Sequence, residues 1–306
     1  MELNDEVPLG AADMIDERNF KAEYILGDVF PGELPSEVDL FRKTEAKDQG
    51  SSMRCTAYGA AINHQILNSI EHKVNMVFDA EEQWRNQLKF PSTARESIGD
   101  YLLSALKSLK KYGLTDTVTG KVHKIDGYAT IPKNATSFKK YLAAGYVIYT
   151  GAPVTNSNFR KAKHEGLWGG MDGDVVGGHA FVIGQYEEVK GGASRYGAMN
   201  SYGKTWGKFK NGTFDILEQD IAHLFTPYVI YDSKDVRMIF KDVSENSDAA
   251  EVIEWCAKKG IVNGYGEGKD NLEKLFLPKN PITRAEACYL AKNLFNALKE
   301  ELRRSK

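Results

Sequence analysis

The spacing of apolar residues changes near residue 145, and this change constrains the fold more than any other feature. Before that point apolar residues recur at intervals of four, as in Tyr58, Ile62, Ile66 and Ile70, which predicts a helix with one buried face. After it, short apolar or aromatic runs are bounded by Gly, Asn and Pro, which predicts strands. These runs cover residues 146–149, 179–186, 196–201, 213–217 and 228–231. Helices followed by strands indicate an α+β domain whose two halves leave a cleft between them.

Local signals place the ends of three helices in the first half. The helix of residues 58–70 is expected to begin at Cys55. Ser97 starts a capping-box pattern ahead of an apolar stripe that Gly113 can end. Thr136 is expected to cap a shorter helix that stops at Gly145.

The length of 306 residues suits one ordinary domain and a smaller module. We expect residues 1–24 to form a polar arm, on the surface or partly disordered and too short for a folded inhibitory segment. The main domain is expected at 25–232. A compact unit with two further helices follows at 239–298, and residues 299–306 form a charged tail.

Composition excludes several classes of function. The chain has 40 basic and 42 acidic residues, a net charge of -2, and no cluster of Lys and Arg, so nucleic acid is not an expected partner. No run of about eighteen apolar residues occurs, so no membrane span is expected. The acidic first thirty residues do not resemble a signal peptide.

Three cysteines are too few, and odd in number, for a disulfide framework. Cys256 and Cys288 lie in apolar helical stripes and are expected to be structural. Neither has metal-ligand spacing, so no metal or cofactor is expected. Asp172 and Asp174 are expected in a solvated loop, with calcium binding as the less favoured alternative.

Cys55 has a different setting, at the expected start of a helix. Unpaired N–H groups there stabilise a thiolate, although an isolated free cysteine is often only a small buried apolar residue. Gln49, six residues earlier, could donate to an oxyanion. His179 could supply the acid and base that a leaving amine needs, and the amide oxygen of Asn200 could orient the imidazole.

Three segments in this order resemble the papain family of cysteine peptidases. They are Gln-Gly before the cysteine helix, Gly-His-Ala at 178–180, and Asn-Ser-Tyr-Gly-Lys-Thr-Trp-Gly at 200–207. The resemblance spans about residues 25–231 and implies a helical lobe and an antiparallel β lobe. It also implies Cys55 as nucleophile, His179 as acid and base, Asn200 as orienter and Gln49 in the oxyanion hole.

Two further residues are assigned provisional roles beside these. Gly178 is expected to contact substrate, because glycine lets a neighbouring backbone come close. Trp206 is expected to contact substrate or to shield the imidazole from water. The sequence also departs from the family pattern, since it lacks the disulfide cysteine and the tryptophan around Cys55. Tyr202 stands where family members commonly have tryptophan.

Four short motifs between residues 240 and 286 resemble an S-layer-homology repeat, a module that attaches proteins to secondary polymers of bacterial cell walls. The guanidinium of Arg284 suits an anionic saccharide, while the surrounding segment 283–286 would serve equally as a capping box. Residues 264–268 are expected to form a turn rather than a phosphate cradle. Because such repeats generally work in threes, one copy implies self-association, weak binding or another role.

Together these features predict a cysteine endopeptidase that cleaves protein or peptide substrates through a thioester and is directed to a bacterial surface. One alternative keeps the chemistry but aims it at peptide cross-links of the cell wall. Another is a non-catalytic adhesion or virion component. We expect an extracellular or cell-surface location, with a phage-encoded or cytoplasmic protein as the alternative.

Overall fold

Contacts divide the chain into two units in the computed structural model. One comprises Met1–Phe20 with Asp28–Asp232, and the other Lys21–Gly27 with Ser233–Lys306. The structure describes residues 9–14, 21, 22, 26, 29, 30, 32–41, 44–90, 94–189, 193–232, 253, 256, 261, 290 and 294. The two helices predicted for the C-terminal unit therefore lie mostly outside the described residues, and the predicted boundaries of the four segments stay a prediction.

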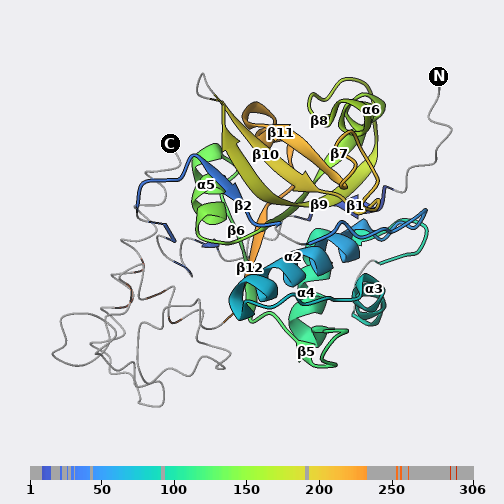
Figure 1. Ribbon diagram of the computed structural model, residues 1–306. Coiled ribbons are helices and arrows are strands. Elements are labelled where there is room, and N and C mark those ends of the chain that lie inside the picture. Colours follow the sequence, from blue (N-terminus) through green and yellow to red (C-terminus); the bar gives the residue numbers. More distant parts are fainter. Residues whose placement is uncertain are drawn as a thin grey trace, which may run out of the picture. The chain divides into compact units, whose positions relative to one another are not determined.

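Three helices form one layer of the first unit, below the sheet in Figure 1. They are α2 (Cys55–His72), α3 (Ala80–Lys89) and α4 (Leu102–Tyr112). Helix α2 is central, because it contacts α3, α4 and the long strand β9 (Val175–Glu188). It is therefore buried from Cys55 through Asn68, on more faces than the single apolar stripe predicts.

An eight-stranded sheet forms the other layer. Its strands run in the order β6-β12-β7-β9-β10-β11-β8, and β2 pairs with β9 beside this path. Apart from β9, they are β2 (Glu37–Asp39), β6 (Gly127–Thr130), β7 (Ile148–Thr155), β8 (Leu167–Trp168), β10 (Ser194–Met199), β11 (Thr213–Leu217) and β12 (Tyr228–Tyr231). All pairings are antiparallel except that of β8 with β11. The prediction of helices first and strands afterwards is confirmed.

The remaining elements are short. They are the strands β1 (Ala11–Ala12), β3 (Asp100–Tyr101), β4 (Leu114–Thr115) and β5 (Val122–His123), the helices α5 (Ala135–Ala143) and α6 (Asn156–Glu165), and a 3-10 turn at Glu218–His223. β4 and β5 pair with each other, and β1 pairs with β3. The pairing of β1 with β3 joins the N-terminal segment to the helical layer.

Two predicted helix starts are wrong. Helix α4 begins after Tyr101 rather than at Ser97, because Gly99 has a φ of 89° and the next two residues form β3. Helix α5 is capped by Asn134, whose side chain accepts a hydrogen bond from a backbone N–H, rather than by Thr136. Helix α4 thus begins without a side-chain cap, while for α5 the backbone conformation selected Asn134 over the nearby Thr136.

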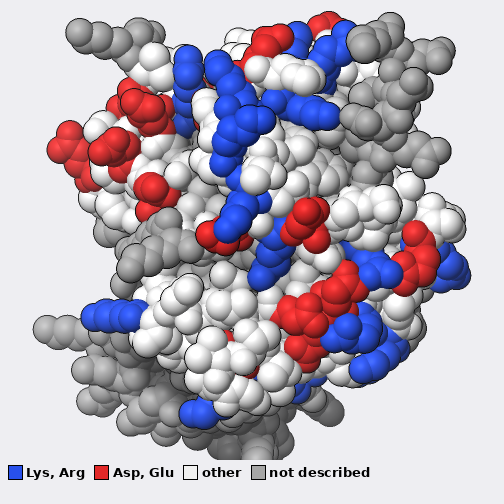
Figure 2. Space-filling view, turned by 45° about the vertical axis from the view of Figure 1, so that its right-hand side comes forward, with Lys and Arg blue, Asp and Glu red and all other residues white. Residues whose placement is uncertain are grey.

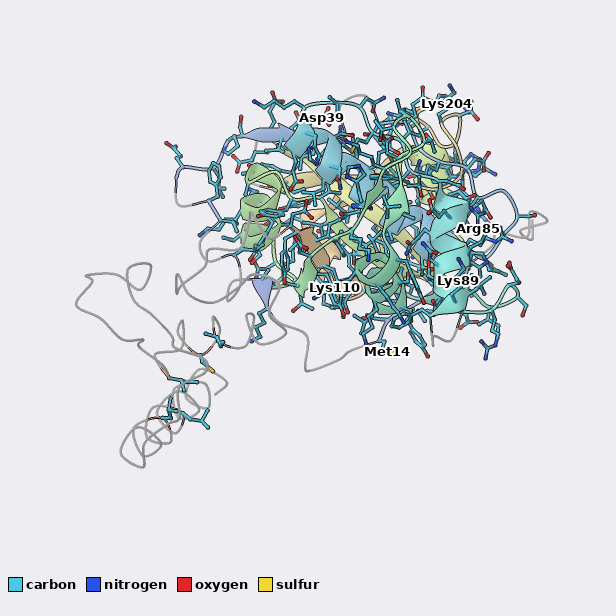
Figure 3. All side chains as sticks on the ribbon, turned by 90° about the horizontal axis from the view of Figure 1, so that it is seen from below. Met14, Asp39, Arg85, Lys89, Lys110 and Lys204 are labelled. Atoms are coloured by element: carbon cyan, nitrogen blue, oxygen red, sulfur yellow. The ribbon has the colours of Figure 1, made fainter. Side chains whose placement is uncertain are left out.

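Charges of both signs cover the surface of the first unit. In Figure 2 Lys and Arg form a band that runs from the top of the view down toward its centre, while Asp and Glu gather at the upper left and mix with Lys and Arg at the lower right. Seen from below, Arg85 and Lys89 on α3 and Lys110 on α4 lie at the periphery (Figure 3). None of the helices in the described ranges is long and apolar enough to cross a membrane.

Candidate active site

Cys55 is the first residue of α2, where the unpaired N–H groups of a helix gather. Its side chain is 0% exposed. Backbone groups of Ala180 and Gly10 hydrogen-bond with its thiol. Since Ala180 directly follows His179 on β9, the thiol lies beside the strand that carries the histidine.

His179 and Asn200 form a buried pair. The imidazole Nε2 lies 2.8 Å from the Asn200 Oδ1 atom. The backbone N–H of Ser201 donates to the same Oδ1 at 2.6 Å, so this atom accepts and is the amide oxygen. Nε2 must therefore carry hydrogen and donate, which leaves a lone pair on Nδ1 of the neutral ring.

The side chain of Gln49 is fixed at both ends of its amide. The Ser201 hydroxyl donates to Gln49 Oε1 at 2.5 Å, and Gln49 Nε2 donates to the Ser52 carbonyl at 2.5 Å. An amide nitrogen carries two hydrogens, so a second one is available for an oxyanion. Sequence reasoning missed Ser201, although its place directly after Asn200 was a signal.

Tyr202 is the second residue that sequence reasoning missed. Its ring stacks on the His179 ring, with centroids 4.8 Å apart and planes at 10°. Its hydroxyl lies 3.3 Å from Nδ1 of His179. Trp206 packs on the outer side, with centroids 5.8 Å from Tyr202 and 6.0 Å from Phe159. Tyr202 therefore takes the place beside the imidazole that we had expected Trp206 to fill.

The N-terminal segment pairs with both layers of the first unit. Strand β1 pairs in parallel with β3 of the helical layer, and Gly10 bridges in parallel to Gly178 of the sheet. Asp100 donates its backbone N–H to the Gly10 carbonyl at 2.8 Å. Figure 1 shows β1 between β9 and the helices. The prediction of a surface or partly disordered arm is therefore wrong for these residues.

Close backbone contacts hold this segment in place. A Cβ atom on Gly10 would lie 2.1 Å from the Met53 carbonyl oxygen, and one on Gly178 would lie 2.1 Å from the Ala11 carbonyl oxygen. Further along, Asp13 accepts hydrogen bonds from the backbone and the hydroxyl of Thr226, both at 3.0 Å. Only glycine permits such approaches, so the segment fits closely over Cys55.

Burial governs the protonation of Cys55 and His179. It raises the pKa of the Cys55 thiol to about 11, against the opposing hydrogen bonds of Ala180, Gly10 and the first residues of α2. It lowers the pKa of His179 to about 4, although the hydrogen bond to Asn200 acts the other way. At neutral pH the structure therefore holds a neutral thiol and a neutral imidazole.

The structure thus brings Cys55, His179, Asn200, Gln49 and Gly178 together where the helical layer meets the sheet, and the roles given to them stay predictions. Arg284 and Cys288 lie outside the described residues. Cys256 is half-buried. Among the described residues, no group of three or more His, Cys, Asp or Glu side chains could hold a metal ion.

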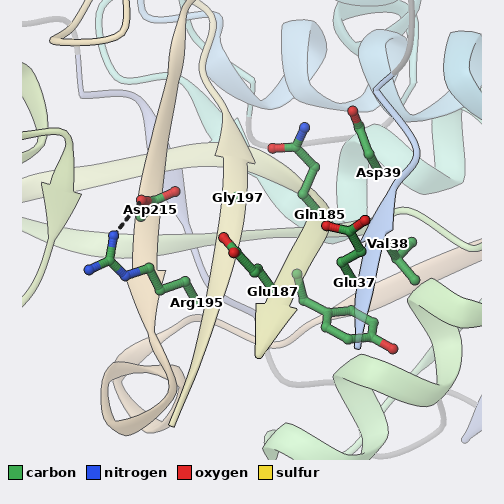
Figure 4. A pocket seen from close by; sticks show the side chains of 9 residues that line it. Glu37, Val38, Asp39, Gln185, Glu187, Arg195, Gly197 and Asp215 are labelled. Carbon is green, nitrogen blue, oxygen red and sulfur yellow. Dashed lines mark ion pairs between the residues drawn. The ribbon is translucent and has the colours of Figure 1, made fainter. Parts of the chain in front are cut away.

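A hollow lined by none of the candidate site residues lies across strands β2, β9, β10 and β11 (Figure 4). It has a volume of about 500 Å³ and is lined by Glu37, Asp39, Glu187 and Asp215, with Arg195 3.7 Å from the Asp215 carboxylate. Neither histidine nor cysteine lines it. It therefore lacks both residue types that Cys55 and His179 bring together.

Solved structures of similar fold are cysteine proteases. Xylellain, a cysteine protease from Xylella fastidiosa, matches with a TM-score of 0.60 and 20% identity over 76% of this chain and 99% of its own. proCathepsin B S9 from Trypanosoma congolense matches with 0.59 and 16%, over 73% and 86%. Procathepsin L 3 of the Tenebrio molitor larval midgut matches with 0.58 and 14%, over 74% and 77%. The papain-like fold is confirmed.

The family model of the S-layer homology domain matches residues 239–288. No curated protein matches the chain. The chain therefore combines a papain-like fold of a helical and a β lobe with an S-layer homology domain near its C-terminal end.

Proposed function

We propose that this protein is a cysteine peptidase, with Cys55 as nucleophile, His179 as acid and base, Asn200 as orienter and Gln49 as oxyanion donor. The observation that carries the proposal is the meeting of three distant segments. The Asn200 Oδ1 atom lies 2.8 Å from Nε2 of His179. The backbone of Ala180, which follows His179, contacts the Cys55 thiol. A cysteine that serves only to fill the core does not require a hydrogen-bonded histidine and asparagine beside it.

The reaction follows from the side chains present. Nδ1 of His179 takes the thiol proton, and the Cys55 thiolate attacks the substrate carbonyl. The developing oxyanion accepts from the Cys55 backbone N–H and from the second hydrogen of the Gln49 amide. The imidazolium then gives its proton to the leaving amine, and a thioester remains. Water, deprotonated by His179, attacks the thioester and releases the acid and the thiol.

Peptide can reach Cys55 only when residues 9–14 move away from it. Gly10 touches both Met53 and the Cys55 thiol, so a substrate carbonyl and Gly10 would occupy the same place. The described state is thus the covered form of the proposed peptidase. Movement of residues 9–14 away from Cys55 would expose Cys55 and His179 to water. This removes burial, the main cause of both pKa shifts.

Labelling of Cys55 tests this function. The full-length protein is incubated with a thiol-directed epoxide, and peptide mapping distinguishes Cys55 from Cys256 and Cys288. We expect labelling of Cys55 that His179→Ala slows at pH 6 to 7, and casein hydrolysis that Cys55→Ala abolishes. Equal labelling of all three cysteines, with hydrolysis unchanged in Cys55→Ala, would rule out the peptidase and favour a non-catalytic adhesion or virion component.

We further propose that the S-layer homology domain associates the peptidase with a bacterial cell surface. The match at residues 239–288 supports this. Binding of the full chain to purified cell-wall sacculi is expected to weaken in Arg284→Ala, with Arg303→Ala in the charged tail as the control. Release of amino groups from sacculi but not from casein would favour the wall cross-link peptidase instead.

A further inference from the structure

Gly10 lies directly against the proposed nucleophile. It is buried, and its backbone hydrogen-bonds with the Cys55 thiol. In the proposed reaction the sulfur bonds to a substrate carbonyl carbon, so the substrate residue that carries this carbonyl must take the place of Gly10. The space that the protein leaves at this place therefore decides which substrate residue Cys55 can attack.

Backbone atoms of other segments enclose Gly10. A Cβ atom on Gly10 would lie 2.1 Å from the Met53 carbonyl oxygen and 2.8 Å from the Met53 Cβ. On another side, a Cβ atom on Gly99 would lie 2.4 Å from the Cα of Gly10, and Gly10 also bridges to Gly178. Non-bonded carbon atoms reach their best separation only at about 3.5–4.0 Å. The place of Gly10 thus accommodates a main chain but no side chain.

The segments that carry Met53 and Gly99 are tied to each other. Arg54, which follows Met53, donates to one oxygen of the Glu96 carboxylate from Nε at 3.1 Å and from Nη2 at 3.0 Å. The backbone N–H of Gly99 donates to the Arg95 carbonyl at 2.8 Å, next to Glu96. These contacts restrain Met53 and Gly99 from moving apart to admit a side chain.

We propose that the peptidase attacks the carbonyl of glycine, and that Met53 and Gly99 determine this specificity. The proposal rests on the proposed function and adds its substrate class, which is peptides and proteins with glycine before the scissile bond. Glycine brings its carbonyl to the thiol with its Cα between two backbones. A larger residue places its Cβ against the Met53 carbonyl and Cβ. Residues 9–14 fit over Cys55 for the same reason, because Gly10 has no side chain.

Three fluorogenic peptide amides test this specificity on the full chain. They share one sequence and an aminocoumarin leaving group, and differ only in having glycine, alanine or leucine before the scissile bond. One methyl group without room lowers kcat/KM about tenfold. We therefore expect kcat/KM to be about tenfold lower for the alanine amide than for the glycine amide, and lower still for leucine. Displacement of residues 9–14 multiplies all three rates alike, so the ratios report specificity alone.

Met53→Gly removes the Cβ atom and lets the backbone at position 53 adapt. In this variant the preference for glycine over alanine should fall from about tenfold toward one. Met171→Gly, in the segment between β8 and β9, is the matched control and should keep the wild-type preference. The wild-type ratios test the proposal independently of how well Met53→Gly folds.

Equal kcat/KM values for the three amides would overturn the glycine specificity and leave the peptidase standing. Hydrolysis of casein without hydrolysis of the glycine amide would do the same. An unchanged preference in folded Met53→Gly would show that Met53 does not determine it. If neither the amides nor casein are hydrolysed, the proposed function itself fails, and the specificity fails with it.

Discussion

Ser201 connects two of the proposed site residues, Asn200 and Gln49, by hydrogen bonds. Its backbone N–H donates to Asn200, and its hydroxyl donates to Gln49. One residue thereby orients both the partner of the imidazole and the proposed oxyanion donor. Because a donor must meet the oxyanion at hydrogen-bond distance, loss of the hydroxyl should affect the reaction more than substrate binding.

We expect Ser201→Ala to lower kcat about tenfold with little change in KM, since the freed Gln49 amide loses its orientation. Steady-state hydrolysis of a peptide substrate measures both constants. The control is a double-mutant cycle, in which Ser201→Ala should have almost no further effect in a Gln49→Ala background. Additive losses in the double variant would show that Ser201 acts by another route.

The sequence predicted those residues of the candidate site that can be recognised by their type within a short motif. Cys55, His179, Asn200 and Gln49 were identified from the sequence because each belongs to a short motif. Tyr202 and Ser201 stood in the same motif, but their contacts depend on the close pairing of residues 47–49 with 201–203. The closeness of two backbones cannot be deduced from the spacing of residues along one of them.

At the scale of helices and strands, the periodicity of apolar residues predicted the long elements and missed the short ones. Helix α2 and strand β9 were found, although both extend beyond the predicted limits. Strand β1 has only two residues, Ala11 and Ala12, and is held by partners on β3. Such a short strand has no apolar period of its own, so it is determined by its pairing partners in the folded protein and not by its own sequence.

The N-terminal segment makes an element-scale prediction. A valine at position 10 would place its Cβ 2.1 Å from the Met53 carbonyl oxygen, which is far inside contact distance, so Gly10→Val should force residues 9–14 away from Cys55. Overpacking of this kind costs about 1–3 kcal/mol. We therefore expect peptide hydrolysis by Gly10→Val to rise about tenfold, measured from the initial rate without prior incubation.

Gly32→Val is the matched control for this variant. A Cβ at Gly32 meets only the Phe30 ring, at 3.8 Å, so the same substitution there is expected to leave the rate unchanged. An unaltered rate in Gly10→Val, with its fold intact by circular dichroism, would mean that residues 9–14 do not limit access to Cys55.

The stability of the first unit is expected to depend on pH, because two of its histidines are buried in the neutral form. His64 lies inside α2, stacked on Phe78 at 4.5 Å, and neither of its ring nitrogens has a hydrogen-bond partner among the described residues. Burial, with a smaller contribution from His123, lowers its pKa to about 3, and burial lowers that of His179 to about 4. Both rings can protonate near pH 6.5 only after unfolding.

The unfolded chain therefore binds more protons than the native one between pH 6.5 and about 4, and the free energy of unfolding should fall as the pH falls through that window. Each such histidine contributes about 1.4 kcal/mol per pH unit. Urea unfolding at pH 7, 6 and 5 measures this through tryptophan fluorescence, since Trp84, Trp168 and Trp206 all lie in the first unit.

His64→Leu should show a clearly shallower dependence of the free energy of unfolding on pH. His164→Leu, an exposed control, should show the wild-type dependence. Equal slopes in wild type and His64→Leu would show that protonation of His64 does not drive the loss of stability.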